Sequence, residues 1–324
     1  MAPTAEEVTE TPIPYVEGQV LSLKDIDGKE LSVTITKVYR VTISPVMEVQ
    51  IRASGETEYQ EAVLKMFDRR FGEDRYFYDD TKRVPHTEQR EAAWQEYVRQ
   101  GLEMHLLTFI ENHRKEFRLK RIRYLDGYDD PNEPEWMSFG KHEAIFHWKA
   151  HAKYKTEIEA YHELKELQGR RVPQLISTVT LTLPSDRPDL PPIYFEIPGI
   201  LLQKINGFTL SKMFREVDNP MLWKQITQDA IEAAKYVNRA GVINFDMRLQ
   251  NVVVARLDDG GFQPFMIDFA QSTFRRNYKD TDNPQDPAGY EFNAKKIRNP
   301  GVIAILASDK AWRKEGCNLK LEFK

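Results

Sequence analysis

The sequence has 324 residues and only one cysteine, Cys317, so no intramolecular disulfide can form. One cysteine and seven scattered histidines also provide no thiolate zinc site. No apolar run approaches the ~18 residues that a membrane span requires. The formal net charge is −4, which gives no overall basic field for nucleic acid or an anionic membrane. These absences argue against disulfide-stabilised, zinc-binding, membrane-spanning and nucleic-acid-binding proteins.

The start of the chain, MAPTAEEVTETPIP, has neither an apolar signal segment nor an Arg-rich presequence. We therefore expect an intracellular, cytoplasmic protein, with a nuclear location left open. Residues 1–17 are acidic and contain Pro and Thr, which predicts a disordered lead. The whole chain is 41% hydrophobic and 30% charged, as in soluble globular proteins, and is long enough for one large domain or two small lobes.

Three β-rich, partly alternating segments predict an antiparallel meander over about 31–67. Their sequences are LSVTITKVY, PVMEVQIRA and YQEAVLKMF. The turn Ser54-Gly55-Glu56 separates the last two.

The stretch from about 71 to 150 predicts a long helix over about 87–116, followed by a loop at DGYDDPNEPEW. Beyond it, periodicity and turn residues predict a helix, two strands and a second helix, in that order. Their ranges are about 153–169, 172–183, 198–205 and 222–241. One short helix is expected near 300–315.

Three residues with hard oxygen donors lie around a predicted hairpin. Asp246 and Asn251 flank a short loop, and Asp268 ends the second strand of the hairpin that follows Asn251. The start and end of a hairpin lie side by side, so Asn251 and Asp268 are expected close together. Carboxylate and amide oxygens suit Mg²⁺, which binds few protein groups and leaves room for substrate phosphates.

This pattern resembles a known family. Asp246-x4-Asn251 followed by Asp268-Phe269 is similar to the catalytic loop and magnesium-binding motif of the protein kinase superfamily. The resemblance implies that Asn251 and Asp268 bind Mg²⁺, and that Asp246 orients an acceptor hydroxyl and takes its proton.

Ala62-Val63-Leu64-Lys65 resembles the lysine-bearing strand of the same family, whose ammonium holds nucleotide phosphates. Apolar residues flank Lys65 on both strand faces, which predicts a partly enclosed lysine that needs an anionic partner. Glu157 is the predicted partner, because it lies on a helical stripe with Ala160 and Leu164.

PGILLQKI resembles the last strand before a nucleotide-binding hinge. In this resemblance Leu202 lies at the back of the adenine pocket, and backbone groups of Gln203 and Ile205 meet the adenine edge. The segment Glu157-Ile158-Glu159-Ala160-Tyr161 with Leu167-Gln168-Gly169 resembles the protein-kinase-like proteins of filamentous fungi.

The implied fold is α+β and bilobal. It has an antiparallel-sheet N-lobe over 18–205, with a helical insertion at about 71–150, and a truncated, mainly α C-lobe over 206–324.

The sequence also departs from the family pattern. The first predicted strand pair has no glycine between Leu31 and Ser54, so a glycine-rich phosphate-covering loop is not expected. Asn244 replaces the usual histidine, Arg248 the usual lysine, and Ala270 the usual glycine. No Ala-Pro-Glu follows Ala270, which argues against an ordinary peptide-docking platform.

The predicted function is ATP- and magnesium-dependent phosphotransfer to a hydroxyl acceptor, either a small molecule or a protein. One alternative is a pseudokinase, which would bind nucleotide or act as a scaffold without catalysis. A second alternative is an interaction module that binds a protein partner through the insertion at about 71–150.

Overall fold

The computed structural model describes residues 11–42, 44–52, 59–72, 75, 84–120, 132–183 and 189–323. The chain forms two compact units. Unit 1 comprises 1–152 and 177–201, and unit 2 comprises 153–176 and 202–324.

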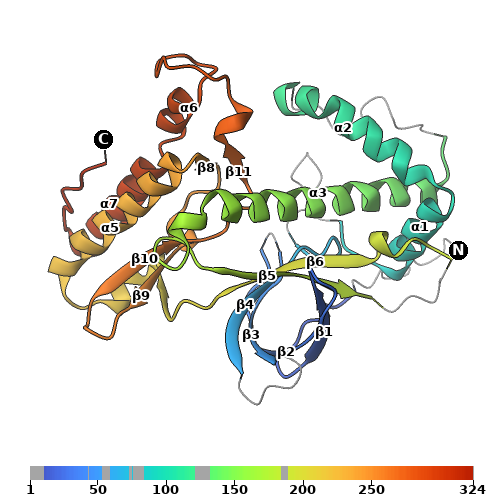
Figure 1. Ribbon diagram of the computed structural model, residues 1–324, viewed down its shortest axis with the longest axis horizontal. Coiled ribbons are helices and arrows are strands. Elements are labelled where there is room, and N and C mark those ends of the chain that lie inside the picture. The colour runs from blue at the N-terminus through green and yellow to red at the C-terminus, as the bar shows by residue number, and fades with distance from the viewer. Residues whose placement is uncertain are drawn as a thin grey trace, which may run out of the picture. The chain divides into compact units, whose positions relative to one another are not determined.

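The first unit is built around a closed β-barrel with the strand order β1-β2-β3-β4-β6-β5 (Figure 1). The strands are β1 (Val20–Asp25), β2 (Glu30–Val38), β3 (Val46–Arg52), β4 (Gln60–Met66), β5 (Leu175–Thr182) and β6 (Glu196–Gln203). The predicted meander is confirmed, since β3 pairs antiparallel with both β2 and β4. The sheet closes because β1, which the sequence did not predict, pairs antiparallel with both β2 and β5.

Alternation explains why these segments are strands. In β2 the side chains of Leu31, Val33 and Ile35 are buried, and the residues between them face outward or are half-buried. The β1 strand shows the same pattern with only two buried residues, Leu21 and Leu23, so its signal is short. The predicted turn at 54–56 lies outside the described residues.

The single helix predicted over about 87–116 is wrong. The chain forms α1 (Glu88–Arg99) and α2 (Leu102–Lys120), separated at Gly101, whose φ of 68° is left-handed and ends α1. Thr87 caps α1 by accepting a hydrogen bond from the Arg90 N–H. Aromatic and aliphatic side chains of α1, α2 and α3 form one cluster with Leu190 and Phe195.

The helix predicted from about 153 begins much earlier, because α3 spans Glu135–Glu163. Its first half buries charged and polar side chains, among them Lys141, Glu143 and His147, so no clean apolar stripe marks it in the sequence. Most of the loop predicted at 126–136 lies outside the described residues. The 3-10 turn η2 (Lys165–Leu167) follows α3, and a second one, η3 (Pro192–Tyr194), precedes β6.

In the second unit α5 (Pro220–Arg239) packs against α7 (Asn299–Glu315), β10 and β8. The predicted stripe of α5 is confirmed, since Ile226, Ala230 and Val237 are buried. The C-terminal helix predicted near 300–315 is α7, whereas α6 (Tyr290–Ile297) was not predicted. The short elements before α5 are β7 (Gly207–Thr209), η4 (Leu210–Lys212) and α4 (Met213–Glu216).

The predicted hairpin is confirmed as β9 (Val252–Arg256) and β10 (Phe262–Met266), which form a three-stranded sheet with β7. A second, two-stranded sheet pairs β8 (Val242–Asn244) with β11 (Ser272–Phe274). The 3-10 turns η5 (Leu249–Asn251) and η6 (Arg275–Asn277) lie beside these sheets. Among the described residues, no helix combines the length and the apolar character needed to cross a membrane.

Candidate functional site

The loop after β8 fixes Asp246 from both sides. The Asp246 N–H donates to Asn244 Oδ1 at 2.8 Å, and Asn251 Nδ2 donates to the Asp246 carbonyl oxygen at 2.8 Å. Asp246 Oδ2 accepts from Arg248 at 2.6 Å and from Asn251 at 3.1 Å. Asp246 Oδ1 accepts no hydrogen bond from any described residue, and the side chain is 22% exposed. One carboxylate oxygen is therefore held and the other is open.

The contacts of Asn251 orient its buried side-chain amide. Both contacts of Nδ2 are to oxygen atoms of Asp246, so the nitrogen and oxygen of the amide cannot be exchanged. Asn251 Oδ1 is then directed elsewhere, and no donor within the described part of the chain occupies it. The Ile267 N–H donates to the Asn251 carbonyl oxygen at 3.0 Å, which ties this loop to the residue before Asp268.

Asp268 lies just beyond the other end of the hairpin. Val252 pairs with Met266 in the register of β9 and β10, so Asn251 and Asp268 flank adjacent strand ends. Asp268 has a φ of 62°, which is unusual for a residue with a side chain, and its carbonyl oxygen accepts from Asn244 Nδ2 at 2.9 Å. The predicted juxtaposition of the two segments is therefore present within unit 2.

Tyr161, on the unit-2 part of α3, packs on Phe269, the residue after Asp268. Its ring meets that of Phe269 edge-on, with centroids 5.7 Å apart, and both side chains are fully buried. Burial raises the pKa of the Tyr161 hydroxyl well above its ordinary value, and the nearby carboxylates of Glu157 and Asp268 raise it further. Glu157 is itself fully buried in α3, so it lies on the packed side of the helix, as its stripe predicts.

Of the predicted hinge residues, Leu202 and Gln203 end β6 and Ile205 follows it. Leu202 is 7% exposed, whereas Gln203 and Ile205 are half-buried. The Gln203 N–H donates to the Gln174 carbonyl oxygen at 2.9 Å, so an adenine contact by the Gln203 backbone would have to use its carbonyl oxygen. Ile205 makes no backbone hydrogen bond with other described residues. The expected adenine contacts thus reduce to one acceptor at Gln203 and the polar groups of Ile205.

Lys65 is the last residue but one of β4 in unit 1. It is only 5% exposed, and its ammonium lies 5.4 Å from the ring centroid of Phe67. The predicted enclosure of this lysine is confirmed. Its role in holding nucleotide phosphates stays a prediction.

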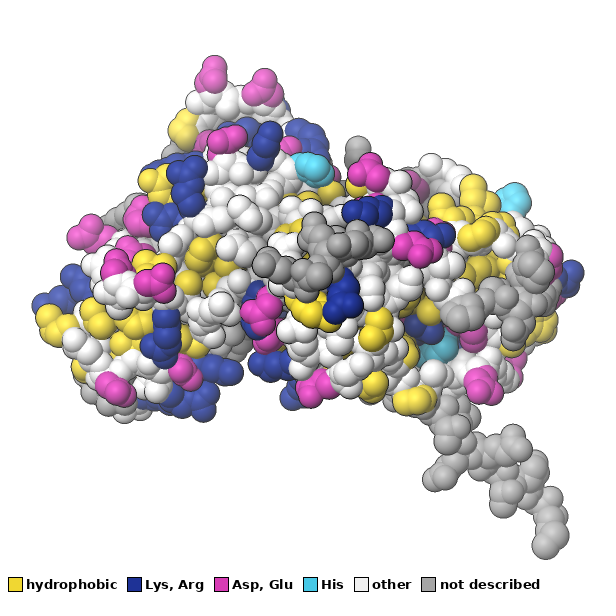
Figure 2. Space-filling model, turned by 60° about the horizontal axis from the view of Figure 1, so that its bottom comes forward, with side chains coloured by type: hydrophobic (Ala, Val, Ile, Leu, Met, Phe, Trp, Pro, Cys, Tyr) yellow, Lys and Arg dark blue, Asp and Glu magenta, His cyan; other side chains and the backbone are white. Residues whose placement is uncertain are grey.

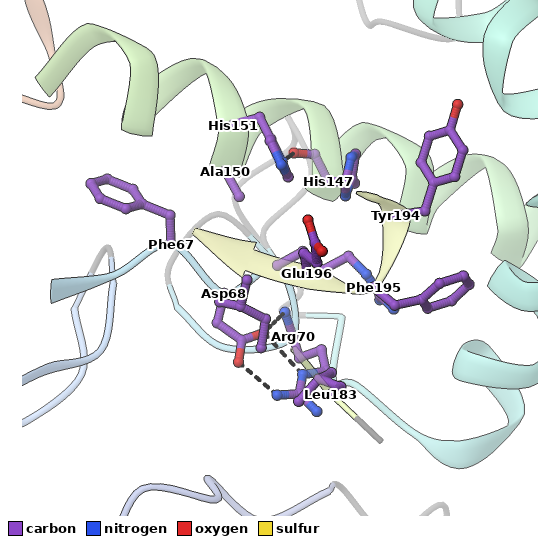
Figure 3. Close-up of a pocket in the computed structure, with 12 residues that line it drawn as sticks. Phe67, Asp68, Arg70, His147, Ala150, His151, Leu183, Tyr194, Phe195 and Glu196 are labelled. Carbon is purple, nitrogen blue, oxygen red and sulfur yellow. Dashed lines mark hydrogen bonds and ion pairs between the residues drawn. The ribbon is translucent and has the colours of Figure 1, made fainter. Parts of the chain in front are cut away.

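A pocket in unit 1 lies between α3 and the chain around Phe67–Arg70 (Figure 3). Its volume is about 20 Å³, which is room for about one water molecule and not for a nucleotide. The rings of His147 and His151 lie on its wall with their centroids 4.0 Å apart and their planes tilted by 38°, and His151 Nδ1 hydrogen-bonds to the His147 carbonyl oxygen. Among the described residues, no group of three His, Cys, Asp or Glu side chains could hold a metal.

Charge on the molecular surface is mixed. On the face shown in Figure 2, basic and acidic side chains are interspersed among apolar ones. The described residues on that face therefore form no continuous basic stripe of the kind that binds a nucleic-acid backbone.

Two residues that support the candidate site could not be assigned this place from the sequence. In the sequence, Asn244 is notable only as a departure from the family pattern, yet its side chain contacts both Asp246 and Asp268. Asn299 was not singled out, although its side chain bonds both backbone groups of Asn244. The sequence Asn299-Pro300 indicates a helix start, and nothing local links it to a loop 55 residues away.

No protein-family model matches this sequence, and no curated protein matches it. Among solved structures, the kinase domain of PknI from Mycobacterium tuberculosis is similar. A cysteine-to-alanine mutant of that domain has 10% sequence identity, with 85% of this chain and 74% of that chain covered and a TM-score of 0.35. A double mutant has 12% identity, with 91% and 76% covered and the same TM-score. Similarity at this TM-score does not assign a function to this chain.

Proposed function

We propose that this chain is an ATP- and magnesium-dependent phosphotransferase of the protein-kinase-like type, which transfers the γ-phosphate of ATP to a hydroxyl acceptor. One observation carries the proposal. The hydrogen bonds of unit 2 join Asp246, Asn251 and Asp268 into a single set, in which an open carboxylate oxygen and an open amide oxygen are held in fixed orientations.

Asp246 is suited to the role of proton acceptor. Its Oδ2 is held by Arg248 and Asn251, so the carboxylate cannot rotate freely, while Oδ1 can accept a hydrogen bond from an acceptor hydroxyl. Phosphoryl transfer depends mainly on positioning and on neutralising charge, so a fixed carboxylate of this kind supplies much of what the protein must provide.

Asn251 and Asp268 would hold Mg²⁺. The donor set fits, because Asn251 Oδ1 is open and a carboxylate follows β10 beside it. When bound, the ion would neutralise negative charge on the nucleotide phosphates. The chain's own part is to orient the amide of Asn251 through Asp246 and the backbone of Asp268 through Asn244.

The remaining roles come from the sequence pattern. Lys65 would hold the α- and β-phosphates with Glu157 as its partner, and Gln203 and Ile205 would meet the adenine beside Leu202. The burial of Lys65 and Glu157 supports this assignment, because buried charged groups require partners of opposite charge.

A pseudokinase is the second candidate, and the first hairpin favours it. The first hairpin is β1–β2 and its turn contains Gly28, so the glycine-free strand pair beginning at Leu31 is not the pair that corresponds to a phosphate-covering loop. That turn is closed by Asp25, whose Oδ1 accepts from the N–H groups of Asp27 and Lys29 at 3.0 and 2.8 Å. Two aspartates in the turn would repel phosphates rather than cover them.

An interaction module acting through the insertion at about 71–150 is the third candidate. Several of its charged and aromatic side chains pack inside unit 1, where Arg75, Glu143 and Trp94 are fully buried. This observation weighs against a surface built chiefly for a partner.

The test is thermal protection. ATP with Mg²⁺ is expected to raise the melting temperature of the purified chain, and Asp268→Asn is expected to abolish the rise. Asp309→Asn is the control, because it makes the same substitution at an exposed position on α7, and this variant should keep the rise in melting temperature. Absence of any shift with Mg-ATP would contradict the proposed nucleotide site. A shift without phosphate transfer to any acceptor would favour the pseudokinase.

A further inference from the structure

We infer that Asn244 is a positioning residue, whose single buried side-chain amide holds the backbone of Asp246 and the backbone of Asp268 in place. Asn244 ends β8 and is fully buried. Its Oδ1 accepts from the Asp246 N–H at 2.8 Å, and its Nδ2 donates to the Asp268 carbonyl oxygen at 2.9 Å. The consequence for nucleotide binding rests on the proposed function, whereas the geometry of the contact does not.

The chemistry of the contact selects an amide. A backbone N–H can only donate and a backbone carbonyl can only accept, so these two partners fix which end of the Asn244 side chain is oxygen. An aspartate would keep the acceptor for Asp246 and lose the donor for Asp268. A leucine would lose both and leave two buried polar groups without partners.

The contact acts where the backbone needs support. Asp268 has a φ of 62°, in the left-handed region that residues with a side chain rarely occupy. Such a conformation persists where surrounding contacts fix it. The bond from Asn244 holds the carbonyl of this residue, and the packing of the Phe269 ring on Tyr161 holds the residue that follows.

Asn244 is fixed in turn by Asn299, at the start of α7. Asn299 Oδ1 accepts from the Asn244 N–H at 3.2 Å, and Asn299 Nδ2 donates to the Asn244 carbonyl oxygen at 2.6 Å. Asn299 is 2% exposed. The backbone N–H, the backbone carbonyl and both side-chain atoms of Asn244 thus have partners inside the protein. Two of these partners belong to Asn299, so the start of α7 helps to fix the position of Asn244.

The first experiment measures the magnesium requirement. In Asn244→Asp, the Mg²⁺ concentration that gives half of the ATP-dependent rise in melting temperature should increase by ~10–100-fold, as is typical when a residue that orients a metal ligand is changed. Asn299→Asp, which removes the donor to the Asn244 carbonyl, should increase it less. A purely structural role would lower the melting temperature without ligand and leave the magnesium requirement unchanged.

Asn293→Asp is the matched control. Asn293 Nδ2 donates to the carbonyl oxygens of Gly289 and Pro287 at 2.7 and 3.0 Å, so the variant also loses an amide donor to backbone oxygen, but away from the candidate site. Its magnesium requirement should equal that of the unmodified chain. A requirement in Asn244→Asp within twofold of this control would overturn the inference.

The second experiment needs no nucleotide. Hydrogen exchange of the Asp246 amide, followed by mass spectrometry on peptides covering 245–251, should stay slow in Asn244→Asp and become at least tenfold faster in Asn244→Leu. Equal exchange in the two variants would contradict the contact itself. If the unmodified chain shows no Mg-ATP shift, the proposed function fails, and this exchange measurement still decides whether Asn244 holds the loop.

Discussion

Replacing Glu143 by glutamine tests the buried ion pairs that fix the chain beyond β4. Glu143 Oε1 accepts from Arg75 Nη2 at 2.6 Å, and Oε2 accepts from Arg75 Nη1 at 3.0 Å and from Arg69 Nη1 at 2.7 Å. The side chains of Glu143 and Arg75 are 0% exposed, and that of Arg69 is 7% exposed. Burial alone would raise the pKa of Glu143, but Arg75 and then Arg69 lower it below its ordinary value.

Glutamine has nearly the same volume, so the change removes charge without opening a cavity. The two arginines would then remain buried with less compensation. Arg69 keeps Glu91, whereas Arg75 keeps no carboxylate among the described residues, only backbone carbonyl oxygens and the ring of Phe146. Removing one partner of a buried pair costs about 3–5 kcal/mol. We therefore expect the free energy of unfolding of unit 1 to fall by about that amount.

The assay is urea unfolding followed by tryptophan fluorescence, which reports on unit 1 through Trp94, Trp136 and Trp148. Glu96→Gln is the control, because Glu96 pairs with Arg99 on the exposed face of α1 and its loss should change the midpoint little. A midpoint for Glu143→Gln equal to that of the control would refute the reasoning, since it would mean that the buried pairs add no stability.

Two further predictions concern stability. Burial, and after it the positive charge of Arg90, lowers the pKa of His142 to about 4, and burial followed by His151 lowers that of His147 well below its ordinary value. The unfolded chain therefore binds more protons than the folded chain below pH ~6.5, so the melting temperature should fall from pH 6.5 to 5. His147→Gln should reduce that fall. An unchanged dependence of the melting temperature on pH in this variant would contradict the prediction. Gly140→Ala would place a Cβ 2.6 Å from Tyr97 Cβ and should cost about 1–3 kcal/mol, whereas Gly301→Ala, whose Cβ would lie 3.5 Å from its neighbours, should not.

Alternation and helical periodicity predicted the parts of the fold that bury clean apolar faces. The strands β2, β3 and β4, the hairpin of β9 and β10, and the stripe of α5 follow directly from the sequence. The first half of α3 could not be found this way, because its buried face contains Lys141, Glu143 and His147. Glu143 is buried together with the distant Arg69 and Arg75, and Lys141 pairs with Glu133, so burial of these charges depends on partners outside the helix.

The candidate site likewise contains residues that the sequence indicates and residues that only the structure reveals. Asp246, Asn251 and Asp268 could be selected because a short loop and a hairpin bring them together locally. The supporting residues could not, since Asn299 reaches Asn244 across 55 residues of sequence and Tyr161 reaches Phe269 from α3, far earlier in the chain. Contacts of this range depend on the packing of whole elements, which residue spacing does not encode.

Transfer of labelled phosphate tests the central claim most directly. The purified chain is incubated with γ-labelled ATP, Mg²⁺ and a panel of small-molecule and protein hydroxyl acceptors. We expect label on an acceptor, and a loss of ~10²–10⁴-fold in Asp246→Asn, which removes the proton acceptor but keeps the thermal shift with Mg-ATP. No transfer from the unmodified chain, or equal transfer from Asp246→Asn, would contradict the assignment of this site as a phosphotransferase centre.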